Sequence, residues 1–341
     1  MALFRAGIIG TGRPWNTPGA TGFGMAHEHV RGYLASTDVA LVALCDIVVE
    51  RARLFQEEHG GERIYQDYHE MLEKENLDIV SITTWPQLHY EMVITAAEAG
   101  VKAIHCEKPM TLTYGGAKRM VQVCQERGVQ LSFNHQRRFS TEFQQARELL
   151  KSGAIGKLIR MEAGCPDLFD WGTHWFDMLF FYNDQVPVEW VIGQIEPHGG
   201  RIVFDVKHEE QGISSFKYAN GVKGSLLTGH TPTWEGYNRL YGEEGVIEVD
   251  MTRRPMLRIW GKGMKKWHGI KTEEADATKL GILDSIEALK TGREPELAGR
   301  KALNATEMCF ATYESARRGG RVELPLQIED SPIVEILERS K

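Results

Sequence analysis

Two separate stretches of this chain carry residue types that can bind a ligand or move a proton. In the first, Lys108 stands between Glu107 and Pro109, directly after an apolar run over residues 101–105. This run is typical of a short buried strand bounded by turn residues. A lysine that leaves the carboxyl end of such a strand stands where open α/β sheets bind their ligands. A solvated loop lysine remains the alternative interpretation.

The second stretch places Asp170, His174 and Asp177 at positions i, i+4 and i+7. On a helix, this spacing puts the three side chains on one face. Histidine changes its charge near neutral pH and suits the role of a general base, which a neighbouring carboxylate can orient. A structural interpretation stays open, with Asp170 as a helix N-cap and Asp177 as the partner in a buried ion pair.

The elements that must position these residues are indicated by alternating apolar runs and helical patterns through residue 134. Such alternation predicts a parallel, doubly wound sheet with helices on its faces. The predicted strands are 5–9, 40–45, 79–83, 103–106 and 130–133, and the predicted helices are 26–35, 49–59, 87–99 and 115–127.

The first predicted strand runs into a glycine turn that contains Gly10 and Gly12. Glycines at this point let the backbone turn tightly and approach a pyrophosphate at the N-terminus of the next helix. An insertion over residues 13–23 then delays the third small residue, which is Gly24 or Ala26. An ordinary surface loop is the alternative. We expect the insertion to fold over the cofactor cleft, because its two ends are held near the turn.

Asp46 ends the second predicted strand, 34 residues after Gly12. Without the eleven-residue insertion the spacing is 23, close to the ~20 residues expected for an acid that binds the ribose of a dinucleotide. A carboxylate at this position accepts hydrogen bonds from the ribose hydroxyls and repels a 2′-phosphate. Since no arginine follows Asp46 directly, the sequence favours NAD over NADP.

The pattern changes after residue 157 to short β-rich segments separated by turns. The dipeptide Asn220-Gly221 indicates a hairpin, and residues 242–245 indicate another turn. We expect a mostly antiparallel open sheet that covers helices on one face and pairs with another subunit on the other. The predicted strands are 157–163, 189–195, 213–219, 222–228, 238–241, 246–249 and 256–260, and the closing helices are 278–289 and 300–318. The predicted domains are residues 1–134 and 135–341.

Composition excludes several classes of protein. The 341 residues suffice for two domains, and 42% hydrophobic with 26% charged residues is ordinary for a soluble globular chain. The net charge of −7 argues against a nucleic-acid or anionic-membrane partner. No apolar run approaches the ~20 residues of a membrane span, and the N-terminus lacks the features of a signal peptide.

Cysteine and histidine usage predicts a cytoplasmic protein without a metal site. Five scattered cysteines, with no Cys-x-x-Cys pair, fit reduced thiols better than disulfides or zinc ligands. His27 and His29 are the most suggestive histidine pair. Residues at positions i and i+2 of a helix point in roughly opposite directions, so we do not expect these two to share a metal ion.

Several segments resemble one known family. Residues 78–89 (DIVSITTWPQLH), 99–109 (AGVKAIHCEKP) and 152–156 (SGAIG) are similar to characteristic segments of the glucose–fructose oxidoreductase/inositol dehydrogenase (Gfo/Idh/MocA) family. The resemblance covers essentially the whole chain. Two features depart from the family pattern: the insertion at residues 13–23, and Trp85, which separates a threonine and a proline that the family usually places together.

The resemblance implies an N-terminal NAD-binding Rossmann domain followed by an α+β domain that binds substrate and forms a homodimer or homotetramer. It further implies that Lys108, Asp170 and His174 face the nicotinamide and the substrate, because residues 170–177 match the family's D-x-G-x-H-xx-D motif. Other residues are expected at the cofactor or substrate on the same ground: Gly10, Gly12, Ala26, Asp46, Thr84, Trp85, His89, Glu107 and Asn134 at the cofactor, and Arg137 at the substrate.

The activity implied by the resemblance is oxidation or reduction of a secondary hydroxyl of a sugar, sugar derivative or cyclitol. Removal of a hydride from carbon requires a base for the hydroxyl proton, which His174 supplies, and a cation such as Lys108 stabilises the developing oxyanion. Two alternatives remain: a glycosidase or lyase that works through a transient keto-sugar, and a nucleotide-binding sensor without catalysis. Four aromatic residues are left open as pocket walls or core: Trp15, Trp171, Trp175 and Trp234.

Overall fold

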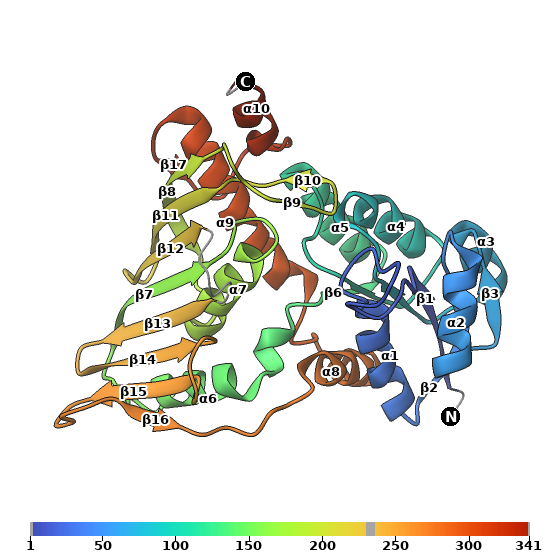
Figure 1. Ribbon diagram of the computed structural model, residues 1–341, viewed down its shortest axis with the longest axis horizontal. Coiled ribbons are helices and arrows are strands. Elements are labelled where there is room, and N and C mark those ends of the chain that lie inside the picture. The colour runs from blue at the N-terminus through green and yellow to red at the C-terminus, as the bar shows by residue number, and fades with distance from the viewer. Residues whose placement is uncertain (1–2, 230–235, 340–341) are drawn as a thin grey trace. The chain divides into compact units, whose positions relative to one another are not determined.

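The computed structural model describes residues 3–229 and 236–339 of the chain (Figure 1). Trp234 therefore lies outside the described residues. The chain divides into two compact units. The first comprises the described residues as far as Leu112, Gly116–Gln136 and Asp276–Ala302, and the second comprises Thr113–Gly115, Arg137–Ala275 and the described residues from Leu303 onward.

The first unit is built on a parallel sheet. Within the described residues it has six strands in the spatial order β3-β2-β1-β4-β5-β6, which is the order of a Rossmann fold. The predicted doubly wound parallel sheet is confirmed. Its strands are β1 (Phe4–Ile9), β2 (Val39–Cys45), β3 (Arg63–Tyr65), β4 (Ile79–Ile82), β5 (Ala103–Cys106) and β6 (Gln130–Phe133).

The helices of this unit agree with the predicted ranges to within a residue or two, but the sequence analysis missed β3 and the helix that follows it. Both are short and carry mixed polar residues, so neither has a strong apolar period. The helices are α1 (Met25–Ala35), α2 (Val49–His59), α3 (Tyr68–Glu75), α4 (Pro86–Glu98), α5 (Tyr114–Glu126) and α8 (Ala277–Thr291).

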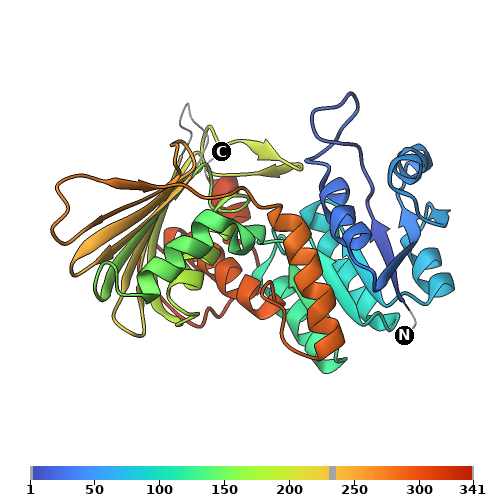
Figure 2. The ribbon, with the colours of Figure 1, turned by 90° about the horizontal axis from the view of Figure 1, so that it is seen from below.

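Helix α8 comes late in the sequence yet packs within the first unit, beside α1 (Figures 1 and 2). Gly32 makes this close packing possible, since a Cβ atom at that position would lie 2.4 Å from Cβ of Ile282. Gln130 at the start of β6 adds a hydrogen bond from Nε2 to the carbonyl oxygen of Ser285, 2.9 Å away. Residues 276–302 thus complete the core of the first unit, although the predicted boundary at residue 134 separates them from it.

The second unit contains a large mixed sheet. Within the described residues it has nine strands in the order β16-β15-β14-β13-β7-β12-β11-β8-β17, antiparallel except where β12 pairs with β7. The predicted, mostly antiparallel sheet is confirmed. The strands are β7 (Leu158–Cys165), β8 (Val188–Glu196), β11 (Gln211–Tyr218), β12 (Lys223–Gly229), β13 (Tyr237–Gly242), β14 (Gly245–Asp250), β15 (Leu257–Gly261), β16 (His268–Ile270) and β17 (Val322–Glu323), with β9 (Ile202–Val203) and β10 (Val206–Lys207) in a separate hairpin.

The two predicted turns join strands of this sheet. Asn220 and Gly221 connect β11 to β12, and Gly221 has a φ of 87°, which glycine adopts without strain. Residues 242–245 lie where β13 turns into β14. The helices of the unit are α6 (Thr141–Lys151), α7 (Gly172–Tyr182), most of α9 (Gly299–Arg318) and α10 (Pro332–Arg339).

The two faces of the large sheet differ. Helix α7, all of whose residues are buried, packs against β7, β12 and β13 on one face (Figure 2). Side chains that alternate with the buried ones along β8, β11 and β12 remain about half exposed: Ile192, Ile213 and Leu227. Ile213 and Leu227 are direct neighbours across the β11–β12 pair. The second face therefore carries a row of exposed apolar side chains.

No helix among residues 3–229 and 236–339 combines the length and the apolar character needed to cross a membrane. All five cysteines are buried free thiols.

Candidate active site

A cavity of about 310 Å³ lies in the first unit at the carboxyl ends of β1, β2 and β4. This is the end of an open parallel sheet at which nucleotides bind. The structure brings five of the predicted cofactor residues together in its wall: Gly10, Gly12, Asp46, Thr84 and Trp85.

The glycine turn leaves backbone accessible on one side of this cavity. Gly10 has a φ of 89°, and a Cβ there would lie 2.7 Å from Cγ2 of Thr84. No atom lies within 4 Å of a Cβ built on Gly12. Gly24, with a φ of 66°, caps the N-terminus of α1, whereas Ala26 is fully buried in the core beneath. Ala26 thus permits close packing of helix on strand and does not line the cavity.

Asp46 fastens the glycine turn to the end of β2. Its Oδ2 accepts hydrogen bonds from the backbone N–H of Gly12 at 2.9 Å and from the hydroxyl of Thr11 at 3.2 Å. Its Oδ1 accepts from the backbone N–H of Val48 at 2.9 Å. The carboxylate is buried and bonded on both oxygens, so its position on the cavity wall is fixed.

Arg51 lies on the same cavity, and sequence reasoning missed it. Its guanidinium is 4.0 Å from Oδ1 of Asp46, and the side chain is only 21% exposed. The prediction of NAD over NADP rested only on the residues directly after Asp46. Arg51 is one turn into α2, and the helix brings it back to the strand end. The cavity therefore holds both a carboxylate and a guanidinium where the ribose acid was predicted.

The insertion at residues 13–23 reaches the cavity through Thr21, which lines its wall. The indole N–H of Trp85 donates to the carbonyl oxygen of Thr21 at 3.1 Å. Trp85 and the insertion, the two departures from the family pattern, are thus bonded to each other. Arg13 instead donates to the carbonyl of Pro18, and Trp15 is 62% exposed beside Phe23.

Glu107 is the centre of a buried hydrogen-bond network at the end of β5. Its Oε1 accepts from Nε2 of His29 at 3.0 Å and from Nδ2 of Asn134 at 2.7 Å, and its Oε2 accepts from the backbone N–H of Lys108 at 3.2 Å. Burial alone would raise the pKa of Glu107, but His29, Lys108 and Asn134 lower it to about 2. Glu107 is therefore a buried anion that holds the backbone at Lys108.

The network continues from His29 into the sheet. Nδ1 of His29 lies 3.1 Å from the hydroxyl of Ser81, which is 2.6 Å from the hydroxyl of Tyr33. Sequence reasoning considered His29 only as a metal ligand, which gave no reason to pair it with Glu107. The two side chains come from α1 and β5, 78 residues apart, and only the sheet brings them together.

His89 lies away from the cavity wall. It is fully buried, and its ring nitrogens lie 2.8 Å from the carbonyl oxygen of Pro109 and 3.0 Å from that of Thr84. Burial lowers the pKa of His89, while the two carbonyl groups oppose this shift. His89 thus connects the end of β4 to the turn that follows β5, rather than lining the cavity.

In the second unit, α7 begins at Gly172, and this corrects one expectation. Asp170 precedes the helix by two residues, so Asp170, His174 and Asp177 do not share one helical face as their spacing predicted. Asp170 and His174 are nevertheless both buried, 2% and 3% exposed. The side chain that stabilises this turn is Asp167, whose Oδ1 accepts from the backbone N–H groups of Asp170 at 2.7 Å and Trp171 at 3.1 Å.

Asp167 is itself held by cations that sequence reasoning missed. Its carboxylate pairs with Arg201 and with Nδ1 of His208, the latter at 3.2 Å. Burial would raise the pKa of Asp167, but His208 and Arg201 hold it well below its usual range. Glu209, next to His208, accepts from the backbone N–H of Leu168 at 2.6 Å. No sequence motif marks these residues, because their partners are about 34 to 41 positions away.

Asp177 forms a buried ion pair with Arg138, as the structural interpretation of Asp177 proposed. Nε and one NH2 group of Arg138 each donate to a different oxygen of Asp177 at 2.8 Å. Both are at most 2% exposed, so loss of one partner would cost roughly 3–5 kcal/mol. Arg137 is only half-buried, and its guanidinium lies 4.5 Å from the ring centre of Trp175 and 5.4 Å from that of Trp171.

Two of the tryptophans that the sequence left open as pocket wall or core differ in burial. Trp175 is fully buried and donates its indole N–H to the carbonyl of Gly164, so it belongs to the core. Trp171 is half-buried beside Arg137.

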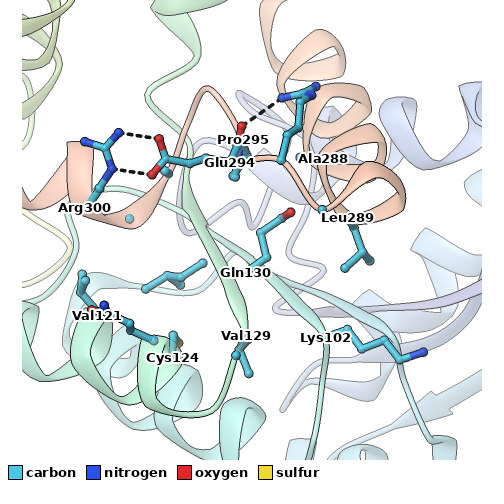
Figure 3. A pocket seen from close by; sticks show the side chains of 17 residues that line it. Lys102, Val121, Cys124, Val129, Gln130, Ala288, Leu289, Glu294, Pro295 and Arg300 are labelled. Carbon is cyan, nitrogen blue, oxygen red and sulfur yellow. Dashed lines mark hydrogen bonds and ion pairs between the residues drawn. The ribbon is translucent and has the colours of Figure 1, made fainter.

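A second, larger cavity of about 540 Å³ lies at the other end of the first unit's sheet (Figure 3). Gln130, the first residue of β6, and the end of α8 form part of its wall. Arg300 and Glu294 make an ion pair on its rim (Figure 3). It contains no residue predicted for the cofactor or substrate, so size alone does not identify the functional cavity.

Comparison with known proteins agrees with the geometry of the first unit. Residues 4–135 match the Gfo/Idh/MocA family model, described as an oxidoreductase family with an NAD-binding Rossmann fold. The predicted resemblance to this family is thus confirmed for the Rossmann domain. The predicted class, an NAD-dependent oxidoreductase, and the predicted NAD cofactor are therefore confirmed.

Similarity to individual proteins extends over nearly the full length of the chain. D-apiose dehydrogenase of Paraburkholderia graminis is 28% identical, over 91% of this chain and 89% of the relative. Myo-inositol 2-dehydrogenase of Thermotoga maritima is 24% identical, over 94% and 98%. The WlbA dehydrogenase of Bordetella pertussis, solved with NADH and UDP-GlcNAcA, has a TM-score of 0.78 at 23% identity, over 95% and 100%. At that identity the structural likeness shows the fold of both units.

The buried Glu107 anion predicts a specific pH dependence of stability. Because its folded pKa of about 2 is below the ordinary 4.5, its contribution is present above pH 4.5 and is lost as pH falls towards 2. The shift corresponds to roughly 3 kcal/mol. We expect Glu107→Gln to lower the urea unfolding midpoint at pH 7 and to flatten its dependence on pH below 4.5. The exposed control Glu73→Gln should change neither, and an unchanged pH profile for Glu107→Gln would contradict this account of the network.

Proposed function

We propose that this protein is an NAD-dependent dehydrogenase that oxidises or reduces a secondary hydroxyl of a sugar, a sugar derivative or a cyclitol. The observation that carries the proposal is the fixed backbone of Lys108 at the carboxyl end of β5, directly after the buried Glu107 anion. The names of the full-length relatives, D-apiose dehydrogenase and myo-inositol 2-dehydrogenase, support the class of substrate.

In this proposal, Gly10 and Gly12 contact the pyrophosphate and Asp46 contacts the adenosine ribose. Thr84 lies beside Gly10, and these four residues line one cavity together with Trp85. Glu107, Asn134 and His89 support the cavity without lining it. All three are buried, and their hydrogen bonds hold the ends of β4, β5 and β6 in place. Bound NAD supplies the hydride acceptor.

The chemistry of the substrate falls to Lys108, His174 and Asp170. Lys108 donates a hydrogen bond to the reacting oxygen and stabilises its negative charge. His174 accepts the hydroxyl proton during oxidation and returns it during reduction. Asp170 orients His174 or binds an adjacent hydroxyl, and Arg137 contributes a further donor to the substrate. The match of residues 170–177 to the family motif supports these roles, as does the burial of both Asp170 and His174.

The remaining expectations form part of the same proposal. Residues 1–134 bind the cofactor, and residues 135–341 supply substrate groups and the oligomer surface, apart from α8, which packs with the first unit. The exposed row of Ile192, Ile213 and Leu227 supports a homodimer or homotetramer formed through the large sheet. The five free cysteines support a cytoplasmic location.

The catalytic assignment predicts that Lys108→Ala and His174→Ala each lower kcat by about 10²–10⁴, the range for loss of an acid–base or electrostatic group. The dissociation constant of NAD should change little. The substrate is found by screening a panel of sugars and cyclitols for NADH formation. A dehydrogenase releases NADH in proportion to substrate consumed, whereas a glycosidase that works through a keto-sugar leaves the cofactor unchanged over a cycle. Lys102→Ala, an exposed lysine just before β5, is the matched control. Near-normal turnover of either variant would remove that residue from the proposal.

Cofactor preference depends on two side chains with opposite charges. Asp46 should make NAD the preferred cofactor, and Asp46→Ser should narrow the ratio of kcat/KM for NAD over NADP, because it removes repulsion of the 2′-phosphate. Arg51 then remains to attract the phosphate, so Asp46→Ser with Arg51→Ala should recover less NADP activity than Asp46→Ser alone. Equal kcat/KM with both cofactors in the unmodified enzyme would contradict the assignment of Asp46.

The insertion is expected to contribute to the cofactor pocket through Thr21 and its bond to Trp85. Replacing residues 13–23 by two glycines should weaken NAD binding or raise the substrate KM several-fold, since it removes part of the cavity wall. Trp85→Phe keeps an aromatic ring but removes the indole N–H that bonds to Thr21, so a smaller change is expected. A deletion variant that folds and keeps both constants would show that the insertion has no role in binding.

A further inference from the structure

Three side chains outside the proposed site converge between α1 and α2. Nδ1 of His27 and Nε2 of His59 lie 2.8 Å apart. The carboxylate of Glu58 is 3.7 Å from the nitrogen of His27 and 3.5 Å from that of His59. Each residue thus presents one ligand atom to a common point. None of the three lines the predicted cofactor cavity.

The separations are close to those of a metal centre. Zinc binds imidazole nitrogen and carboxylate oxygen at about 2.0–2.2 Å in tetrahedral geometry, which places neighbouring ligand atoms about 3.3 Å apart. The 3.7 Å distance is to Oε2 of Glu58 and the 3.5 Å distance is to its Oε1, and one ligand atom of each residue lies within 4.8 Å of the other two. Rotation of the exposed Glu58 side chain and a small separation of the two rings would seat an ion, with a fourth position open to water. Imidazole with carboxylate is also a donor set that suits zinc and its neighbours in the first transition row.

The surroundings keep the histidines ready to bind a cation. Phe55 is 1% exposed and packs against both rings, with ring centres 4.8 Å from His27 and 4.6 Å from His59. Burial lowers the pKa of both histidines. Arg31, a cation of α1, is paired with Glu28 and Asp276.

We propose that His27, Glu58 and His59 form a divalent transition-metal site, for zinc in the first instance, that links α1 to α2. No sequence pattern indicates this site, because His27 is 32 positions from His59. In the sequence, the histidine nearest to His27 is His29. In the structure, His29 points to Glu107 while His27 points to α2. The site is separate from the proposed reaction and contributes to stability.

The test is a titration of the purified full chain, stripped with a chelator, with Zn²⁺ by calorimetry and with Co²⁺ by visible absorption. We expect one equivalent of metal to bind and the absorption bands of tetrahedral Co²⁺ to appear. Saturating Zn²⁺ should raise the melting temperature by about 5 °C, because an ion that binds only the folded chain stabilises it.

Three variants decide whether this cluster is responsible. His59→Ala should abolish the site, and Glu58→Gln, at an exposed position, should weaken Zn²⁺ binding by at least ~10-fold without disturbing the fold. His69→Ala is the matched control, since His69 is an exposed histidine paired with Asp67 on neighbouring α3. Binding that is absent in the unmodified chain, or that is unchanged in both His59→Ala and Glu58→Gln, would overturn the proposal and leave only a histidine hydrogen bond.

Discussion

The buried charge of Glu107 is the constraint on which the first unit's site depends. An ionised carboxylate in a protein interior is tolerated only when its oxygens are bonded, and here His29, Asn134 and the backbone of Lys108 supply those bonds. The donors come from α1, the end of β6 and the turn after β5. Their common bond to one anion fixes these three elements relative to each other, and it sets the point from which the side chain of Lys108 extends.

Asp167 has the same function in the second unit. It is 1% exposed and accepts hydrogen bonds from the backbone of Asp170 and Trp171, while Arg201 and His208 balance its charge. The proposed acid–base residues of both units are therefore positioned by a neighbouring buried carboxylate that takes no part in the reaction. Such support holds a site in its working geometry before substrate binds. Electrostatic stabilisation of a transition state is most effective when the charged groups are already in place.

The cofactor cavity shows how local departures from a family pattern combine. Trp85 and the insertion at residues 13–23 are far apart in the sequence, yet the indole N–H of Trp85 is bonded to Thr21. The two features thus form one wall of one cavity. Arg51 changes the electrostatics of the same cavity, since it places a cation close to Asp46, the acid proposed to select NAD.

The sequence by itself determined the parallel sheet, the mostly antiparallel sheet and five of the residues that line the cavity beside the glycine turn. The hydrophobic period, the Gly10–Gly12 turn and Asp46 are local signals, because each predicts only the structure of residues close to it in the sequence. Tertiary structure alone decided the partners of the buried charges: His29 with Glu107, Arg201 with Asp167, and His27 with His59. It also decided that Asp170 precedes α7 and that α8 packs beside α1. The reason is physical: a buried polar group takes whichever partner the packing brings near, and sequence separation does not encode that distance.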